Sequence, residues 1–257
     1  MTMTPALRVL EHDLRYYRQT WRGTITSTFV APVLFVASLG IGLGTFVDRS
    51  GSAVLAGVPY AAFVGPALLM TQAMQAAIFE NSYPLMGKIE WRRTYAGILA
   101  TPTTVGQLFA GEVLWLTIRI GVGAVGFYAA LLAFGLVRSP SGFLAVPVAI
   151  LTGLAFALPM YAFTATQKTD SAFSLVFRFI QIPLFLFGGT FFPVERLPGF
   201  AQPIAWFTPI ANGVAVGRAA TLGTLDPSAL LHVAVLVAWV GAGGLLAFVA
   251  LRRRVVV

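Results

Sequence analysis

Long stretches without a charged residue constrain this chain more than any other feature. Six stretches each exceed the roughly 18 residues that mark a candidate membrane-spanning helix. Four of them are uncharged, the third contains only Glu112 and Arg119, and the fifth contains only Arg178. The six stretches are residues 23–47, 50–79, 109–137, 139–167, 171–194 and 227–251. They predict an all-α membrane protein with six transmembrane helices.

The composition agrees with this class. Of the 257 residues, 58% are hydrophobic and only 10% are charged, and the mean hydropathy is +0.83. Soluble domains are about 25% charged, so this chain cannot cover itself with polar surface and a water-soluble globule is excluded. The residues outside the stretches are too few for a separate catalytic domain. We expect one transmembrane domain over residues 1–257, with an interfacial helix at 1–22, a six-span bundle at 23–251 and a tail at 252–257.

The placement of the basic residues predicts the topology. With six crossings, eleven basic residues fall on one side of the membrane and four fall on the other. Because basic loops favour the cytoplasmic side, we expect both termini in the cytoplasm. The larger group is Arg8, Arg15, Arg18, Arg22, Lys88, Arg92, Arg93, Lys168, Arg252, Arg253 and Arg254, and the smaller group is Arg49, Arg138, Arg196 and Arg218.

A seventh uncharged stretch, residues 197–217, is long enough to cross but is interrupted by Pro198, Pro203 and Pro209. A crossing here would place the C-terminal arginines outside, against the charge bias. We therefore predict that it enters from the external face and returns as two short helices that each begin with a proline. Non-helical backbone at that depth is tolerated only against protein or a water-filled cavity, which makes the segment a candidate functional element.

The N-terminal segment has the pattern of an amphipathic helix. Leu7, Leu10 and Leu14 recur at helical spacing, and Tyr17 and Trp21 continue the same stripe. The neighbouring face carries Arg8, Arg15, Arg18 and Arg22. Such a helix lies in the headgroup plane of a bilayer. It serves either as a membrane anchor alone or as a contact for a partner protein.

The loop at residues 80–106 is the one sizeable loop predicted on the cytoplasmic side, and it is dense in charged and aromatic residues. We predict a short helix at residues 86–99, which ends before Pro102 because the residue preceding a proline disfavours helix. The loop is either a basic cytoplasmic loop with no further role or a docking helix for a cytoplasmic partner. Its charged and aromatic residues are Lys88, Glu90, Trp91, Arg92, Arg93 and Tyr95.

Three ionisable residues lie inside the predicted spans. Glu112 and Arg119 are seven residues apart on one helix face, about 10 Å along the axis and too far apart for direct contact. Arg178 lies about two turns into the fifth span. Ionisable groups in a span often mark function, although those near a helix end can reach the headgroups instead. A structural role is the simpler interpretation for all three.

The chain lacks the motifs of catalytic and metal-binding proteins. It has no cysteine and only two histidines, His12 and His232, which are far apart in the predicted topology. No Walker A loop, HExxH helix or GxSxG elbow occurs. We expect no metal, no cofactor and no ATP hydrolysis in this chain. If it transports, ATP would be hydrolysed by a separate subunit.

Several short motifs occur along the chain as a recognisable set. They are Phe191–Phe192–Pro193–Val194–Glu195–Arg196–Leu197–Pro198, Ala205–Trp206–Phe207–Thr208–Pro209, Arg218, Ala73–Met74–Gln75–Ala76–Ala77, Phe79–Glu80, and Gly111–Glu112 with Trp115, Thr117 and Arg119. Together they resemble the motifs of a known family, the type-2 (ABCG-like) ABC exporter permeases. Within that family they resemble the nodulation branch most, and the daunorubicin-exporter-type permeases are more distant.

The resemblance implies a permease half-transporter. Two permeases, identical or one paired with a sister, would assemble with two copies of a separate ABC subunit that binds ATP and Mg²⁺. The loop helix would couple to that ATPase through Lys88, Glu90, Trp91, Arg92, Arg93 and Tyr95. The re-entrant helices would cap the pathway on the external side, with Phe192, Pro193, Glu195, Leu197, Pro198, Trp206 and Pro209 as gate residues.

We therefore expect an exporter subunit in a bacterial cytoplasmic membrane that moves an amphiphilic substrate (a drug, a lipid or a lipid-linked saccharide) by alternating access. Its partners would be the ATPase, a second permease and the bilayer, not nucleic acid. An ion-coupled secondary transporter of six spans is the alternative, but it would place ionisable groups near the bilayer midplane. A membrane-embedded enzyme lacks a visible acid, base or metal constellation. A structural or signalling subunit that transports nothing is the remaining alternative.

Overall fold

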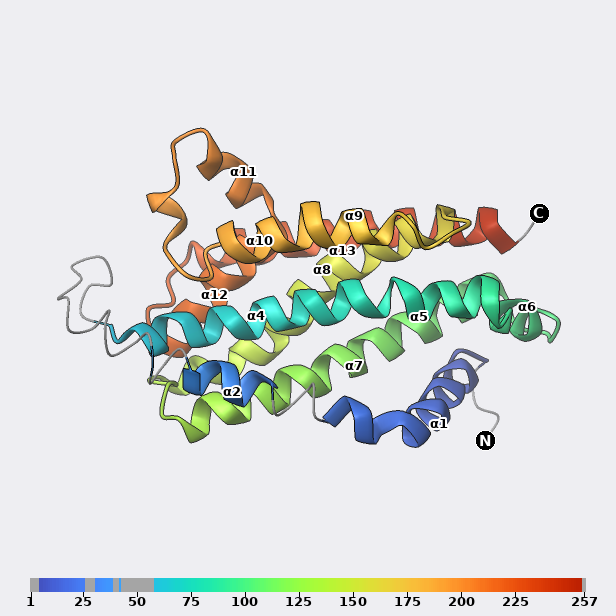
Figure 1. Ribbon diagram of the computed structural model, residues 1–257, viewed down its shortest axis with the longest axis horizontal. Coiled ribbons are helices and arrows are strands. Elements are labelled where there is room, and N and C mark those ends of the chain that lie inside the picture. The colour runs from blue at the N-terminus through green and yellow to red at the C-terminus, as the bar shows by residue number, and fades with distance from the viewer. Residues whose placement is uncertain (1–4, 26–30, 39–41, 43–57, 256–257) are drawn as a thin grey trace.

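The computed structural model describes residues 5–25, 31–38, 42 and 58–255, and the regular structure in these residues is entirely helical (Figure 1). This agrees with the predicted all-α class. The elements, in chain order, are α1 (Pro5–Ile25), α2 (Ala31–Ala37), α4 (Tyr60–Glu80), α5 (Tyr83–Met86), η4 (Gly87–Trp91), α6 (Thr94–Leu99), α7 (Val105–Ala133), η5 (Pro140–Leu144), α8 (Ala145–Thr166), α9 (Phe173–Val176), η6 (Phe177–Gln181), α10 (Ile182–Phe187), η7 (Val194–Arg196), α11 (Ala201–Phe207), α12 (Pro209–Leu222) and α13 (Ala229–Val255).

Four helical segments are long and apolar enough to cross a membrane: Tyr60–Trp91, Val105–Ala133, Pro140–Thr166 and Ala229–Val255. They correspond to the second, third, fourth and sixth predicted spans. The fifth predicted span contains a shorter apolar helix, Phe173–Phe187. Most of the first predicted span, apart from α2, lies outside the described residues, so the total of six stays a prediction.

The long helices run side by side, and the two ends of the bundle differ in charge. In Figure 1, α6 and the last turn of α13 lie at one end and α12 lies at the other. The end with α6 is called the basic end, because Arg92 and Arg93 precede α6 and the last turn of α13 carries Arg252, Arg253 and Arg254. The opposite end is called the α12 end.

Helix α8 is central to the core, where it packs against α4, α7, α12 and α13. Close approach of α12 depends on two glycines one turn apart. A Cβ at Gly217 would overlap Met70 of α4, and a Cβ at Gly213 would overlap Thr152 of α8. Small residues of this kind let membrane helices pack backbone against backbone. They fix α12 firmly to the bundle.

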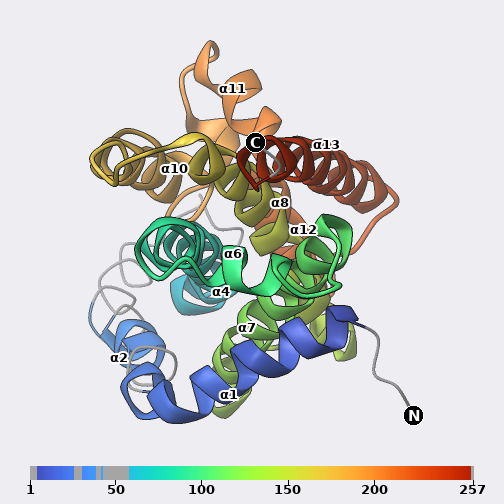
Figure 2. The same ribbon diagram turned by 90° about the vertical axis from the view of Figure 1, so that its right-hand side faces the viewer.

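Helix α1 crosses the direction of the long helices. In Figure 2, α1 runs across the view, whereas α4 is seen nearly end-on. The helix packs on α7, where Gly111 lies so close that a Cβ would come within 2.8 Å of the Ala6 carbonyl oxygen. Val9 is buried on that side, while Leu7 and Leu14 of the predicted apolar stripe are exposed. Residues 5–25 are helical, as the pattern indicates, and Leu10 of the stripe is half-buried. A location of this helix in the headgroup plane stays a prediction.

The segment at residues 197–217 contains two helices, α11 and the start of α12, and its entry from the external face stays a prediction. Thr208 is extended between α11 and α12, and Pro209 occupies the first helical position of α12, where its missing N–H costs nothing. The prediction that both helices begin with a proline is wrong for α11, which begins at Ala201 and carries Pro203 inside its first turn. The backbone before Pro203 accepts helical geometry because the helix is already nucleated by hydrogen bonds to the Pro198 carbonyl.

Candidate functional site

The chain turns sharply at the basic end, in a way that the sequence did not predict. The second span does not end at residue 79 but continues through α5 and the π-helical turn Gly87–Trp91. The Arg92 N–H donates to the Gly87 carbonyl at 2.8 Å, and Arg93 then adopts a left-handed conformation with φ 48°. The single helix predicted at residues 86–99 is therefore wrong, because these two turns divide it. The predicted end before Pro102 is confirmed, since α6 ends at Leu99.

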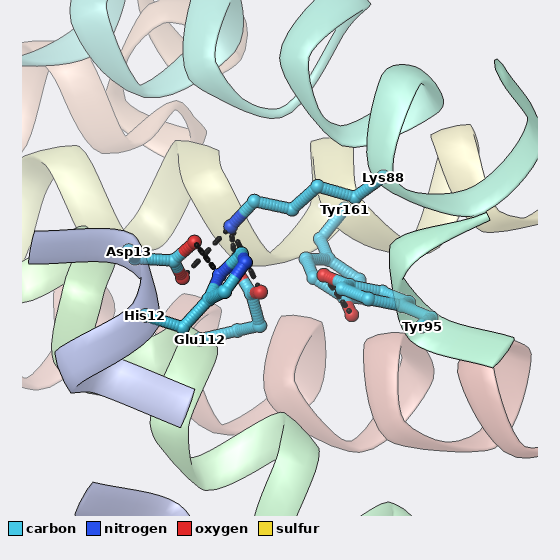
Figure 3. Close-up of polar contacts among 6 residues, drawn as sticks. All are labelled: His12, Asp13, Lys88, Tyr95, Glu112 and Tyr161. Atoms are coloured by element: carbon cyan, nitrogen blue, oxygen red, sulfur yellow. Dashed lines mark hydrogen bonds and ion pairs between the residues drawn. The ribbon is translucent and has the colours of Figure 1, made fainter. Parts of the chain in front are cut away.

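Lys88 of the π-helical turn sits in a buried ion cluster with Asp13 of α1 and Glu112 of α7 (Figure 3). Its Nζ lies 2.9 Å from Asp13 Oδ2 and 2.8 Å from Glu112 Oε2. The side chains are only 14%, 5% and 5% exposed, in the order Lys88, Asp13 and Glu112. A buried cluster of this kind is costly to break, because the partners left behind stay buried and charged. One ammonium therefore joins three elements that are distant in sequence.

Two tyrosines border the cluster. The Tyr161 hydroxyl donates to the Tyr95 hydroxyl at 3.2 Å, and both rings are fully buried (Figure 3). The pKa of Tyr95 is raised well above its ordinary value, chiefly because burial disfavours the phenolate and also because Glu112 is negative. Tyr95 therefore stays neutral. His12 Nδ1 lies 3.5 Å from Asp13 Oδ1 on the exposed side of the cluster.

A second ion pair, Arg119 with Glu80, lies farther from the basic end and again joins α1, the helix Tyr60–Trp91 and α7. Arg119 Nε of α7 donates to Glu80 Oε1, at the end of α4, at 2.9 Å. The Arg119 guanidinium also lies 5.3 Å from the ring centre of Tyr17 of α1, and this ring meets Trp115 edge to face. Glu112 and Arg119 thus have separate partners, in agreement with the prediction that they are too far apart to pair.

A cavity of about 660 Å³ opens between these elements. Charged and aromatic side chains from α1, from the helix Tyr60–Trp91 and from α7 share its wall. The lining residues are His12, Asp13, Tyr17, Phe79, Glu80, Tyr83, Pro84, Gly87, Lys88, Trp91, Arg92, Thr94, Trp115 and Arg119. Within the part of the chain that the structure describes, no group of three histidine, cysteine or acidic side chains could hold a metal ion.

Glu90 connects the turn to the C-terminal helix. Arg254 of α13 donates through Nη2 to Glu90 Oε1 and to the carbonyl oxygen of Gln167, the latter at 3.1 Å. Gln167 directly follows α8. One arginine therefore ties the end of α13 both to the π-helical turn and to the end of α8.

The predicted coupling residues separate into two groups. Trp91 is 61% exposed, and Arg92 and Arg93 are also exposed at the turn. Lys88 and Tyr95 lie beneath this surface, inside the clusters described above. A coupling role for any of these residues stays a prediction. Sequence reasoning quoted Glu80 only as part of a family motif and did not single out Asp13 or Tyr161. Asp13 could have been noticed as an acidic residue in an otherwise basic segment.

At the α12 end, hydrogen bonds from Asn212 stabilise the turn between α11 and α12, which contains the predicted gate residues Trp206 and Pro209. Asn212 donates to the carbonyl oxygens of Trp206 and Thr208, at 2.7 and 2.8 Å, and its own Oδ1 contacts His232 Nδ1 at 2.8 Å.

The predicted gate residues differ in exposure: Leu197 and Pro209 are buried, Phe192, Pro193 and Trp206 are half-buried, and Glu195 and Pro198 are exposed. Arg178 is exposed on η6. Gating by these residues stays a prediction.

Comparison with known proteins identifies relatives over most of the chain. The profile of the ABC-2 type transporter family matches residues 11–222. Nodulation protein J of Rhizobium leguminosarum bv. viciae is 30% identical over 248 residues, which cover 96% of this chain and 94% of the relative. Nodulation protein J of Rhizobium leguminosarum bv. trifolii is 32% identical over 87% of this chain and 83% of its own length. The inner membrane transport permease YadH of Escherichia coli K12 is 24% identical over 94% of this chain and 92% of its own.

Proposed function

Because the chain belongs to the ABC-2 type transporter family, we propose that it is the membrane-spanning permease subunit of an ATP-driven exporter. The substrate is an amphiphile: a drug, a lipid or a lipid-linked saccharide. ATP and Mg²⁺ bind to a separate ABC subunit, and this chain itself catalyses no reaction. The assembly contains two permeases, identical or sister chains, and two ATPase subunits. It resides in a bacterial cytoplasmic membrane with the basic end in the cytoplasm, as the excess of arginine at that end supports.

The observation that carries this proposal is the exposed turn at the basic end. Trp91, Arg92 and Arg93 project from the sharp turn that joins the second span to α6. Aromatic and arginine side chains are enriched where protein partners bind. The turn is also held from inside, through Lys88, to both α1 and α7. A partner that displaced this turn would therefore displace α1 and also α7, which runs toward the opposite end of the bundle (Figure 1).

This arrangement supports transport by alternating access as part of the proposal. ATP binding closes the two ATPase subunits, and their movement is passed to the turns of the two permeases. The basic ends approach each other, and the pathway closes on the cytoplasmic side while the external side opens. The two short helices at the α12 end cap the pathway there.

The test is co-purification with candidate ABC ATPases, followed by ATP-dependent transport in membrane vesicles. The variant Trp91→Ala/Arg92→Ala removes exposed side chains from the turn, and we expect it to weaken ATPase binding at least tenfold. Phe200→Ala is the matched control, because Phe200 is 80% exposed at the α12 end and its removal leaves binding unchanged. Failure of every ATPase to bind, together with absence of ATP-dependent transport, would contradict the proposal.

The same vesicles test the ion-coupled alternative. A secondary transporter needs ionisable groups that bind and release the coupling ion near the midplane. The acidic residues within the described spans are Glu80, Glu90 and Glu112, and all three are ion-paired toward the basic end. We expect export to continue when an uncoupler dissipates the proton gradient at constant ATP. Collapse of export under that condition would favour the secondary transporter.

A further inference from the structure

The cavity at the basic end has the properties of a binding site for an amphiphile. Its volume of about 660 Å³ falls within the range of roughly 300–1,000 Å³ that is typical of ligand pockets. Its wall combines aromatic rings with ionised side chains. The rings are those of Tyr17, Phe79, Tyr83, Trp91 and Trp115. A ligand that fills it therefore needs both an apolar part and a charged or strongly polar part.

Arg119 supplies the polar contact. Its Nε donates to Glu80, while its two terminal nitrogens donate to no residue in the described ranges, although the guanidinium lies against the Tyr17 ring. The side chain is only 14% exposed, and it lines the cavity. A guanidinium has five N–H donors in a planar fork that matches the oxygens of a phosphate. Lys88, by contrast, is already occupied by two carboxylates. An anionic oxygen group is thus the ligand that Arg119 would take.

The depth of the cavity indicates where such a ligand comes from. Helix α4 has 21 residues from Tyr60 to Glu80, so Glu80 lies about 30 Å from Tyr60 along the axis at 1.5 Å per residue. That length equals the thickness of the hydrocarbon core of a bilayer. With one face of the hydrocarbon core placed at Tyr60, where the spanning segment Tyr60–Trp91 begins, the Glu80–Arg119 pair lies at the level where the headgroups of the other face begin. Aromatic residues prefer this level, and Tyr17 of α1 contacts both Arg119 and Trp115 there.

Apolar surface continues outward from the cavity. Phe79, which is part of its wall next to Glu80, is 53% exposed. An acyl chain could lie on this ring and enter the bilayer while its headgroup stays between α1 and α7. Free phosphate would reach Arg119 but would leave this aromatic surface uncovered.

We propose that the cavity binds a phospholipid of the surrounding bilayer, with its phosphate accepting hydrogen bonds from Arg119 and its glycerol and proximal acyl chain packed on the aromatic wall. The lipid joins α1 to the second and third spans, alongside the ion cluster. This binding requires neither an ATPase nor export, so it stands or falls separately from the transport function.

Native mass spectrometry of the full chain in detergent tests the site, with dihexanoyl phosphatidylglycerol as the probe. We expect one tightly bound copy per chain. Dihexanoylglycerol has the same chains without the phosphate, and we expect it to bind at least tenfold more weakly. Inorganic phosphate should not displace the probe at tenfold excess. Equal binding of dihexanoylglycerol would overturn the role of the phosphate, and displacement by inorganic phosphate would show an anion site instead of a lipid site.

Variants locate the site on the chain. The double variant Glu80→Gln/Arg119→Gln removes the guanidinium without leaving Glu80 as an unpaired carboxylate, and we expect at least tenfold weaker binding of the probe. Arg178→Gln is the matched control, since Arg178 is exposed on η6 and does not line the cavity. Unchanged binding by a folded double variant would overturn the assignment to Arg119. The two ligand comparisons use the unaltered chain, so they decide the question even if the double variant does not fold.

Discussion

The two ends of the bundle differ in the groups that stabilise a buried cation. At the basic end, Lys88 is buried between two carboxylates from other helices. At the α12 end, Arg218 donates from Nε to the Phe63 carbonyl at 3.0 Å and from Nη2 to the Gly189 carbonyl at 2.8 Å. Its guanidinium also lies 3.6 Å from the ring centre of Phe63. One cation is thus neutralised by ionised side chains, and the other is solvated by uncharged groups of the backbone and an aromatic ring.

This difference separates a part that can rearrange from a part that is fixed. The ion pairs of the basic end join side chains on α1, η4, α7 and α13, so these elements can shift if pairs exchange partners. The acceptors of Arg218 are backbone carbonyls, which cannot move without the chain itself, and Gly213 and Gly217 lock α12 against its neighbours. We expect conformational change to concentrate at the basic end, where the proposed ATPase contact lies.

Lys88→Ala should have the largest effect, because it leaves Asp13 and Glu112 buried without their cation. Breaking a buried ion pair by removing one partner costs about 3–5 kcal/mol. The measurement is the free energy of unfolding in detergent micelles. Lys168→Ala is the control, because the chain has only these two lysines and Lys168 is exposed. We expect the control to change stability by less than about 0.5 kcal/mol.

The triple variant Lys88→Met/Asp13→Leu/Glu112→Met sharpens this result. Replacing all members of a buried ion cluster by hydrophobic residues of similar volume is often close to neutral, so most of the lost stability should return. Equal losses for Lys88→Ala and Lys168→Ala, or a triple variant no more stable than Lys88→Ala, would show that the cluster is not energetically coupled.

Arg218→Gln should have a smaller effect at the opposite end. The Phe63 carbonyl lies within α4 and keeps its helical hydrogen bond, so the variant leaves mainly the Gly189 carbonyl without a donor. One unsatisfied buried polar group costs about 1–3 kcal/mol. No buried charge is left behind, which is why the expected loss in unfolding free energy is below that of Lys88→Ala. The exposed residue Arg196 provides the control, as Arg196→Gln. A loss larger than that of Lys88→Ala would reverse the proposed contrast between the two ends.

The sequence predicted the elements whose signal is local. The lengths of the uncharged or nearly uncharged stretches were sufficient to predict the four spanning helices. The prolines in residues 197–217 were sufficient to predict that this segment divides into two short helices. The family assignment also came from short local motifs. Each of these signals lies within the segment that it describes.

The ion cluster could not be predicted, because its signal is not local. Lys88 pairs with residues 75 and 24 positions away, and Arg119 pairs with Glu80 39 positions away. No periodicity or composition relates such positions in a single sequence. Residues 86–99 show a second reason why prediction from the sequence fails. Good helix formers lie on both sides of a helix break, and that break depends on one residue in the left-handed conformation, Arg93. Arginine is uncommon in that conformation, so its identity gives no warning.

Arg93→Gly should have the smallest effect and the opposite sign. Arg93 has φ 48°, a conformation that costs a residue with a Cβ about 1 kcal/mol and costs glycine almost nothing. Relief of that cost should stabilise the turn by up to about 1 kcal/mol, measured as the free energy of unfolding. Arg92→Gly is the matched control: Arg92 has φ −97°, so glycine there gains no such relief and should destabilise. If Arg93→Gly destabilised the chain as much as Arg92→Gly, the turn would owe its shape to Arg93 contacts instead of to backbone geometry. The basic end would then be held by side chains at one more position, which would make its contrast with the α12 end still greater.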